Sequence, residues 1–199
     1  MSPDPLAILE TELLRLGLSS ADIREQLTIY IRELERWNKK LNLTSLAGPE
    51  LIRRLVSEPA WIGQQLQMSG VLADIGSGNG SPGVPLYLTS RLSKVHLVEA
   101  RLKRAAFLRH VALLLDSDGI IVHRSRAEEL GDSVPVVDWI SMQAVHPSSV
   151  LLEALLPLSK PTTRVVWITS TQSAPTPKAS RIDIEGGRPV AWVFQLDQF

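Results

Sequence analysis

A glycine-rich segment in the first half of the chain restricts its possible folds more than any other feature. It reads Asp74-Ile75-Gly76-Ser77-Gly78-Asn79-Gly80-Ser81-Pro82-Gly83 and begins within a short apolar run, residues 71–75. An apolar run of this length predicts a buried strand of a parallel sheet. The glycines allow the backbone to turn sharply and to approach a ligand closely, which a Cβ would prevent. In an open parallel sheet this place lies outside the carboxyl ends of the strands, where ligands bind.

Strands and helices are predicted to alternate after residue 70. Strand patterns occupy residues 71–75, 95–99, 120–123, 136–141 and 164–169, and helical patterns occupy residues 83–91, 102–115 and 148–156. Such alternation implies right-handed crossovers and a doubly wound, mostly parallel sheet. Gly186-Gly187 separates the segments 181–185 and 190–196 and is a two-residue turn signal. We therefore expect the sheet to end in an antiparallel hairpin.

The first 66 residues have the pattern of helices instead. Leucines recur at steps of three and four from Leu6 to Leu16, and an apolar stripe runs along a second helix from Leu27 to Leu41. A third helical segment is expected at residues 51–66, interrupted near Pro59. We therefore divide the chain into an N-terminal helical extension, residues 1–66, and a ligand-binding α/β domain, residues 67–199.

The charge of the whole chain does not indicate a nucleic-acid-binding protein, because 21 basic residues balance 21 acidic ones. Cations nevertheless concentrate in two parts of the sequence. One group is Arg32, Arg36, Lys39, Lys40, Arg53 and Arg54, and the other is Arg101, Lys103, Arg104 and Arg109. Either group, taken alone, is more simply interpreted as the solvated face of a helix.

Several classes of protein are disfavoured by what the sequence lacks. It has no cysteine, and its four histidines have no partner three or four positions away, so we predict no disulfide and no metal site. No apolar run approaches the roughly 20 residues that cross a bilayer, and the N-terminus has two prolines and an acid where a signal peptide has lysines. We expect a cytoplasmic monomer that uses neither metal nor membrane.

Acidic residues near the glycine-rich segment help to distinguish between cofactors. Glu99 ends the next strand, where its carboxylate can accept hydrogen bonds from both hydroxyls of a ribose, but dinucleotide enzymes share this arrangement. The charge of Asp74 is poorly placed beside a pyrophosphate and well placed near a cationic cofactor. Pro82 interrupts the helix start that would offer N–H groups to a phosphate. These two details favour S-adenosylmethionine over NAD.

Four sequence blocks, at residues 37–45, 74–86, 103–110 and 126–129, resemble those of the RsmG (GidB) methyltransferases. Members of that family methylate N7 of a guanine in small-subunit ribosomal RNA. The resemblance extends over about residues 25–165. It implies a class I methyltransferase fold (Rossmann-like), S-adenosylmethionine as the cofactor, and ribosomal RNA or the small ribosomal subunit as the partner.

The resemblance also assigns residues to the cofactor. It implies that Gly76 and Ser81 contact the cofactor in the loop and that Ala127 and Glu128 lie beside its adenine. It places Glu99 at the ribose, in agreement with the argument from the residues alone. The predicted cofactor-binding set is Asp74, Gly76, Gly78, Gly80, Ser81, Glu99, Ala127 and Glu128.

The substrate side departs from the family's pattern at three places. Arg54 and Ser57 replace a His and an Asp that follow the N-terminal block, Gln143 replaces an arginine after the fourth strand, and Thr169-Ser170 replaces a Lys-Gly pair after the fifth. Arg53, Arg54 and Gln143 are the candidates for RNA contacts, and the sequence identifies no catalytic residue.

Three functions therefore stay open at this point. The chain is an RNA methyltransferase of this family, a divergent enzyme that methylates another substrate, or a cofactor-binding protein without transfer activity. A basic face at the mouth of the cofactor site would favour RNA, and a closed apolar pocket there would favour a small substrate. An occluded mouth would favour a protein without catalysis.

Overall fold

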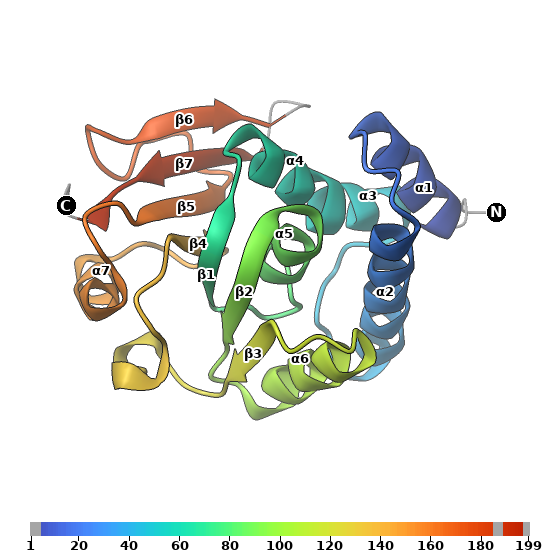
Figure 1. Ribbon diagram of the computed structural model, residues 1–199, viewed down its shortest axis with the longest axis horizontal. Coiled ribbons are helices and arrows are strands. Elements are labelled where there is room, and N and C mark those ends of the chain that lie inside the picture. The colour runs from blue at the N-terminus through green and yellow to red at the C-terminus, as the bar shows by residue number, and fades with distance from the viewer. Residues whose placement is uncertain (1–4, 185–188, 197–199) are drawn as a thin grey trace.

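A computed structural model describes residues 5–184 and 189–196. Its centre is a seven-stranded sheet with the strand order β3-β2-β1-β4-β5-β7-β6 (Figure 1). The strands are β1 (Ser69–Ile75), β2 (Arg91–Val98), β3 (Ile120–His123), β4 (Trp139–Gln143), β5 (Arg164–Thr169), β6 (Ser180–Asp183) and β7 (Val190–Phe194). β1 to β5 are parallel, whereas β7 runs antiparallel to both β5 and β6. The predicted doubly wound sheet with an antiparallel end is confirmed, and the turn predicted at Gly186-Gly187 lies outside the described residues.

Helices cover both faces of the sheet. α5 (Gly83–Thr89) and α6 (Leu102–Leu114) pack on one face and share their core with Leu72 of β1 and Leu97 of β2. α7 (Ser149–Leu155) and the 3₁₀ turn η2 (Ala127–Glu129) cover the other face, over β1, β4 and β5. Further 3₁₀ turns, η3 (Gly131–Ser133) and η4 (Leu156–Leu158), lie on either side of β4 in the chain. The apolar runs of the central strands are buried because both faces are covered.

The N-terminal helices are α1 (Pro5–Arg15), α2 (Ala21–Leu41), α3 (Gly48–Ile52) and α4 (Glu58–Gln65). Leu9, Leu34 and Ile62 from these helices belong to the same hydrophobic core as Leu72 of the sheet. The helices of residues 1–66 are therefore packed onto the sheet that follows them. None of the described helices is long and apolar enough to cross a membrane.

Several element bounds differ from the predictions; β2, for example, begins at Arg91 and not at residue 95. Two further differences have a local explanation or contact. The interruption expected near Pro59 is a π-helical turn, η1 (Arg53–Ser57), which joins α3 to α4 without breaking the helix. A widened turn suits this place because proline has no N–H for the preceding carbonyl groups. The fourth strand, expected from residue 136, begins at Trp139; the N–H of Val137 donates to Leu158, outside the sheet, and that of Asp138 is the first to donate to β1, at Val71.

Candidate functional site

A cavity of about 320 Å³ opens at the carboxyl ends of β1 and β2. It brings together Gly76, Glu99, Ala127 and Glu128, which are four of the eight residues predicted to bind a cofactor. The other residues that line it are Ile75, Val98, Ala100, Ser125, Arg126, Val145, Ser148 and Leu151. The walls are thus mainly apolar, with one buried carboxylate at the end of β2.

The Glu99 carboxylate is held by the backbone. Its Oε2 accepts a hydrogen bond from the N–H of Gly78 at 3.0 Å, and its Oε1 accepts one from the N–H of Arg101 at 2.7 Å. Only 6% of the residue is exposed. Each carboxylate oxygen has two lone pairs, so each can accept a further hydrogen bond from a ligand hydroxyl. The carboxylate is therefore already oriented at the cavity before a ligand binds.

The loop after β1 has the backbone conformation that favours glycine. Gly76, Gly78 and Gly80 have φ values of +73°, +52° and +95°. A Cβ at Gly76 would lie 2.6 Å from Cγ2 of Val145, a side chain on the cavity wall. The N–H groups of Gly76 and Ser77 both donate to the carbonyl of Val98, which fixes the loop against β2. Any other residue at position 76 would therefore collide with Val145 and would be strained by the positive φ.

Asp74 lies behind the loop and does not line the cavity. The residue is fully buried, and Ser141 on β4 donates a hydrogen bond of 2.6 Å to its Oδ1. Burial raises its pKa to about 6. A Cβ at Gly83 would lie 2.8 Å from Oδ2 of Asp74, so the start of α5 packs directly on this carboxyl group. The structure thus gives Asp74 a supporting position below the loop and no direct path to a ligand in the cavity.

Gly78, Gly80 and Ser81 belong to the loop but do not line the cavity either. The hydroxyl of Ser81 donates to Oε1 of Gln143 at the end of β4, at 3.3 Å. From the other side, the hydroxyl of Tyr30 on α2 donates to the carbonyl of Asn79 at 3.0 Å. The loop is therefore fastened to β4 and to α2. The bond from Tyr30 was not predicted, because its position in the sequence marks it only as part of an apolar stripe.

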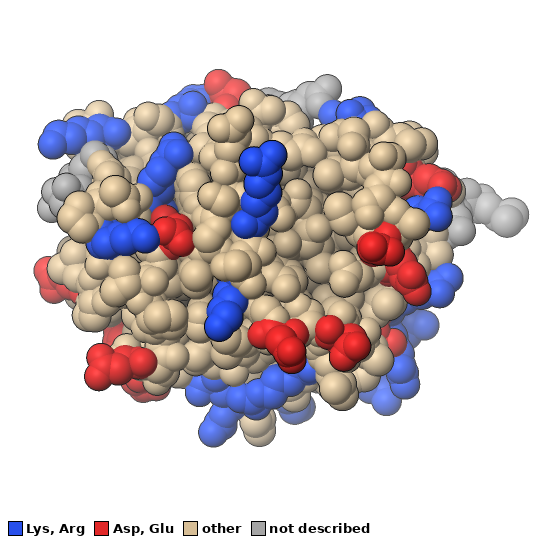
Figure 2. All heavy atoms as spheres, viewed as in Figure 1, with Lys and Arg blue, Asp and Glu red and all other residues tan. Residues whose placement is uncertain are grey.

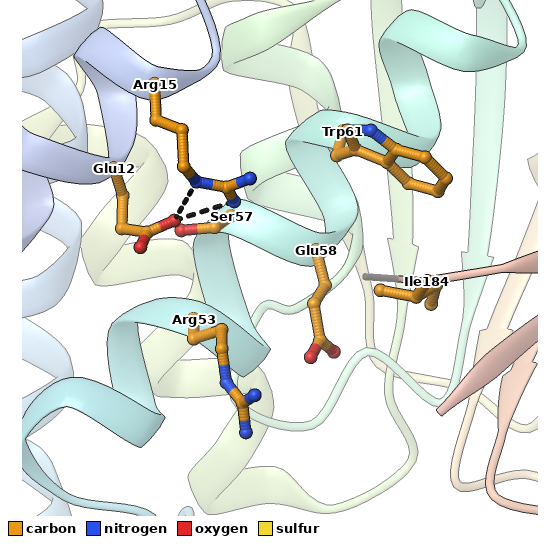
Figure 3. A pocket seen from close by; sticks show the side chains of 7 residues that line it. All are labelled: Glu12, Arg15, Arg53, Ser57, Glu58, Trp61 and Ile184. Carbon is orange, nitrogen blue, oxygen red and sulfur yellow. Dashed lines mark hydrogen bonds and ion pairs between the residues drawn. The ribbon is translucent and has the colours of Figure 1, made fainter. Parts of the chain in front are cut away.

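The two arginines expected to contact RNA lie in the π-helical turn. Arg53 lines a second cavity of about 320 Å³ (Figure 3), between α1, α4 and Ile184 at the end of β6. Asp183 pairs with Val190, which pairs with Thr169, so this end of β6 lies at the carboxyl edge of β5. The substrate-side candidates Arg53 and Gln143 thus both lie at the carboxyl edge of the sheet, but the structure does not bring them into one cavity.

Glu58 is a residue of this cavity that the sequence did not single out. It extends into the space beside Arg53 (Figure 3), only 4% of it is exposed, and neither carboxylate oxygen has a hydrogen-bond partner among the described residues. The nearest charge is Nε of Arg54, at 3.5 Å. Burial raises the pKa of Glu58 to about 7. An acid in the first turn of a helix is normally exposed, so no sequence signal would have found it.

The first cavity fits the adenosine part of S-adenosylmethionine. Its apolar side chains, including Val98, Ala127 and Leu151, can enclose a purine ring. The buried Glu99 carboxylate has the acceptor capacity for two ribose hydroxyls. Its charged lining residues are two acids, Glu99 and Glu128, and one cation, Arg126. Over residues 5–184 and 189–196, no cluster of three or more acidic or histidine side chains could hold a metal ion.

Comparison of the sequence with known protein families and proteins identifies a family to which the chain is similar. The family model described as "GidB: rRNA small subunit methyltransferase G" matches residues 23–185. A ribosomal RNA small subunit methyltransferase G from Roseiflexus sp. is 34% identical over 83% of this chain and 74% of its own length. The protein of the same name from Staphylococcus carnosus is 31% identical over 83% of this chain and 72% of its own length.

Solved structures show the same fold. A SAM-dependent methyltransferase from Aquifex aeolicus superposes with a TM-score of 0.57 at 15% identity, over 76% of this chain and 95% of that protein. The precorrin-6y C5,15-methyltransferase from Geobacter metallireducens superposes with a TM-score of 0.53 at 14% identity, over 68% of this chain and 84% of that protein. At such identities the likeness concerns the arrangement of the strands and helices.

Proposed function

Because the chain belongs to the GidB family of small-subunit ribosomal RNA methyltransferases, we propose that it transfers the methyl group of S-adenosylmethionine to N7 of a guanine in that RNA. One observation carries the cofactor assignment. Gly76, Glu99, Ala127 and Glu128, chosen from the sequence as cofactor residues, line a single cavity at the carboxyl edge of the sheet. Family membership favours this function over a different substrate or a protein without transfer activity. Acting on ribosomal RNA places the protein in the cytoplasm.

Different residues of the cavity bind different parts of the cofactor. Glu99 holds the ribose hydroxyls, and the neighbourhood of Ala127 and Glu128 holds the adenine. The backbone at Gly76 passes close to the cofactor because no side chain intervenes. Asp74, Gly78, Gly80 and Ser81 contribute indirectly, since they set the shape of the loop. When bound, S-adenosylmethionine supplies a methyl group on a positively charged sulfur.

The chemistry needs placement more than proton transfer. Guanine N7 is an acceptor with a free lone pair and carries no proton that a base must remove. The protein's task is to hold N7 in line with the methyl group and to exclude water from the contact. The proposed transfer therefore needs no general base from the protein. Arg53, Arg54 and Gln143 act on the RNA by position and charge, and not by proton transfer.

Methyl transfer tests the proposal against both alternatives. Purified protein is titrated calorimetrically with S-adenosylmethionine and then incubated with labelled cofactor and either 30S subunits or protein-free small-subunit ribosomal RNA. We expect binding of the cofactor and labelling of at least one of these RNA substrates. Binding without transfer to either substrate would favour another acceptor or a non-catalytic role. Absence of cofactor binding at about millimolar concentration would overturn the cofactor assignment itself.

A further inference from the structure

The groove between α2 and α6 lies beside the cofactor loop and is not used by the proposed chemistry. We propose that it binds a single-stranded segment of the RNA next to the acceptor guanine, with one unstacked base lying against Trp37. This inference rests on the proposed function, because it takes RNA as the substrate, and it adds a second, separate contact region for that RNA.

The groove is a cavity of about 350 Å³ lined by Arg36, Trp37, Lys40, Leu41 and His110. Trp37 is partly exposed, and its inner side is supported by two other rings. Its ring centroid lies 5.7 Å from that of Phe107 and 5.3 Å from that of His110. A tryptophan fixed in this way presents a flat surface without losing side-chain entropy when a base stacks on it.

A hydrogen bond fixes the other wall of the groove. Nε2 of His110 lies 2.7 Å from a carboxylate oxygen of Glu33, whose other oxygen lies 3.4 Å from the guanidinium of Arg36. Arg36 still has a highly exposed side chain, and Lys40 is exposed as well. Glu33 therefore orients the histidine and one arginine, while both cations of the groove remain accessible to a phosphate group.

Glu33 is held by His110 and Arg36, and the charged side chains that line the groove itself are basic. No acidic residue occurs from residue 36 to residue 49 or from residue 100 to residue 115, whereas these stretches contain Arg36, Lys39, Lys40, Arg101, Lys103, Arg104 and Arg109. Figure 2 shows Lys and Arg side chains gathered at the lower edge of the molecule, where Figure 1 places the start of α6 and the C-terminal end of α2. Cations beside an exposed aromatic ring are the combination that binds single strands without sequence preference.

Two contacts connect the groove to the cofactor loop. Tyr30, two helical turns before Trp37 on α2, donates its hydroxyl hydrogen bond to Asn79 of the loop. On α6, the guanidinium of Arg104 lies 3.5 Å from the position that a Cβ at Gly78 would occupy. His110 follows Arg104 by six residues, or about 9 Å along the helix. At the roughly 3.4 Å spacing of a stacked strand this is about three nucleotides. The groove thus lies within reach of a short strand that also passes the cofactor loop at Gly78, and we take that strand to carry the acceptor guanine.

The inference is tested by fluorescence anisotropy with a labelled single-stranded oligouridylate, at about 50 and 200 mM salt. Trp37→Leu keeps an apolar side chain and removes the stacking surface, and we expect binding to weaken by about tenfold. Lys40→Gln should weaken binding and lower the slope of log affinity against log salt by about one. The matched control is Lys94→Gln, an exposed lysine on β2 that lies away from the groove, which should bind like the wild type.

Folding and function are monitored separately. Each variant must keep the affinity of the wild type for S-adenosylhomocysteine, which shows that it is folded. If Trp37→Leu does not fold, Trp37→Phe replaces it; this variant keeps a ring and should retain most of the RNA binding. Wild-type RNA binding by both Trp37→Leu and Lys40→Gln would overturn the inference. A loss that follows charge alone, with polyglutamate competing as well as RNA, would also overturn it. If the wild type binds the oligonucleotide but methylates no ribosomal RNA, the proposed function is wrong, whereas the binding of single-stranded RNA in the groove still holds.

Discussion

The backbone N–H of Gly78 donates a hydrogen bond of 3.0 Å to the Glu99 carboxylate, so the loop after β1 is tied to the end of β2. The same carboxylate faces the cofactor cavity. One side chain therefore shapes the glycine-rich loop and, in the proposed function, also offers acceptors to the ribose. This proposed double role makes Glu99 the first residue to test for cofactor binding.

Replacing Glu99 by Gln should weaken cofactor binding without unfolding the protein. The amide keeps the size of the side chain but loses the charge, and its NH₂ group opposes one of the two backbone N–H donors. Hydrogen bonds to a charged group contribute about 1.5–3 kcal/mol, so the Kd for S-adenosylhomocysteine should rise by about 10- to 100-fold. Calorimetric titration measures it. Glu129→Gln, in the same 3₁₀ turn as Glu128 but outside the cavity, is the control. Equal Kd values for the two variants would contradict the role of Glu99.

Replacing Asp74 by Asn distinguishes a supporting role from direct recognition of the cofactor's charge. Because Asp74 lies behind the loop, the affinities for S-adenosylmethionine and S-adenosylhomocysteine should change by the same factor. A direct contact with the sulfonium would weaken only the binding of the charged cofactor. Competition binding with both compounds at pH 8 gives the ratio. A selective loss of S-adenosylmethionine would show that Asp74 reaches the ligand after all.

Replacing Arg53 by Gln should impair use of the RNA and leave the cofactor affinity unchanged. Arg53 is exposed at a cavity on the carboxyl edge, where its charge is available to a phosphate. We expect the KM for the RNA substrate to rise severalfold. The slope of log RNA affinity against log salt concentration should become smaller in magnitude by about one. Arg15→Gln is the matched control, since Arg15 lines the same cavity and is held by Glu12 at 2.9 Å. Similar effects of both substitutions would argue against a specific contact at Arg53.

Glu58 should make the stability of the protein depend on pH. Burial raises its pKa to about 7 in the folded protein, against the ordinary value of 4.5. Between these pH values the folded state holds a proton that the unfolded chain has lost, so the contribution of Glu58 to stability falls as the pH rises. The Tm of Glu58→Gln minus that of the wild type should therefore increase from pH 5 to pH 8. Thermal unfolding followed by circular dichroism measures this difference, and a constant value would contradict the raised pKa.

The parallel sheet and the cofactor cavity were predictable because they depend on local patterns. Buried parallel strands have apolar runs, the loop needs its glycines, and the acid at the end of β2 is placed by the strand that precedes it. The sequence pattern is thus enough to put Glu99 at the edge of the sheet, where the structure has it lining the cavity. The enclosure of Asp74 by Ser141 and Gly83 has no such local pattern, and the roles of both residues in cofactor binding stay predictions.

The substrate side was less predictable because its geometry arises from contacts between distant elements. Pro59 indicated a break, and the chain instead formed a π-helical turn that carries Arg53 and Arg54. The cavity that contains Glu58 is completed by Ile184, more than a hundred residues later in the chain. Pro59 marks the place of the turn but not its π-helical form, and the buried acid has no signal in the sequence.

The most direct test of the proposed function is to identify the RNA atom that receives the methyl group. Small-subunit ribosomal RNA treated with the protein and S-adenosylmethionine is cleaved with borohydride and aniline, a reaction that breaks the strand at N7-methylguanine, and the product is mapped by primer extension. We expect one new cleavage site at a guanine, and weaker cleavage there when Glu99→Gln is assayed at cofactor concentrations that saturate only the wild type. A methylated RNA that resists this cleavage would contradict the proposed function, because the methyl group would then be on another atom.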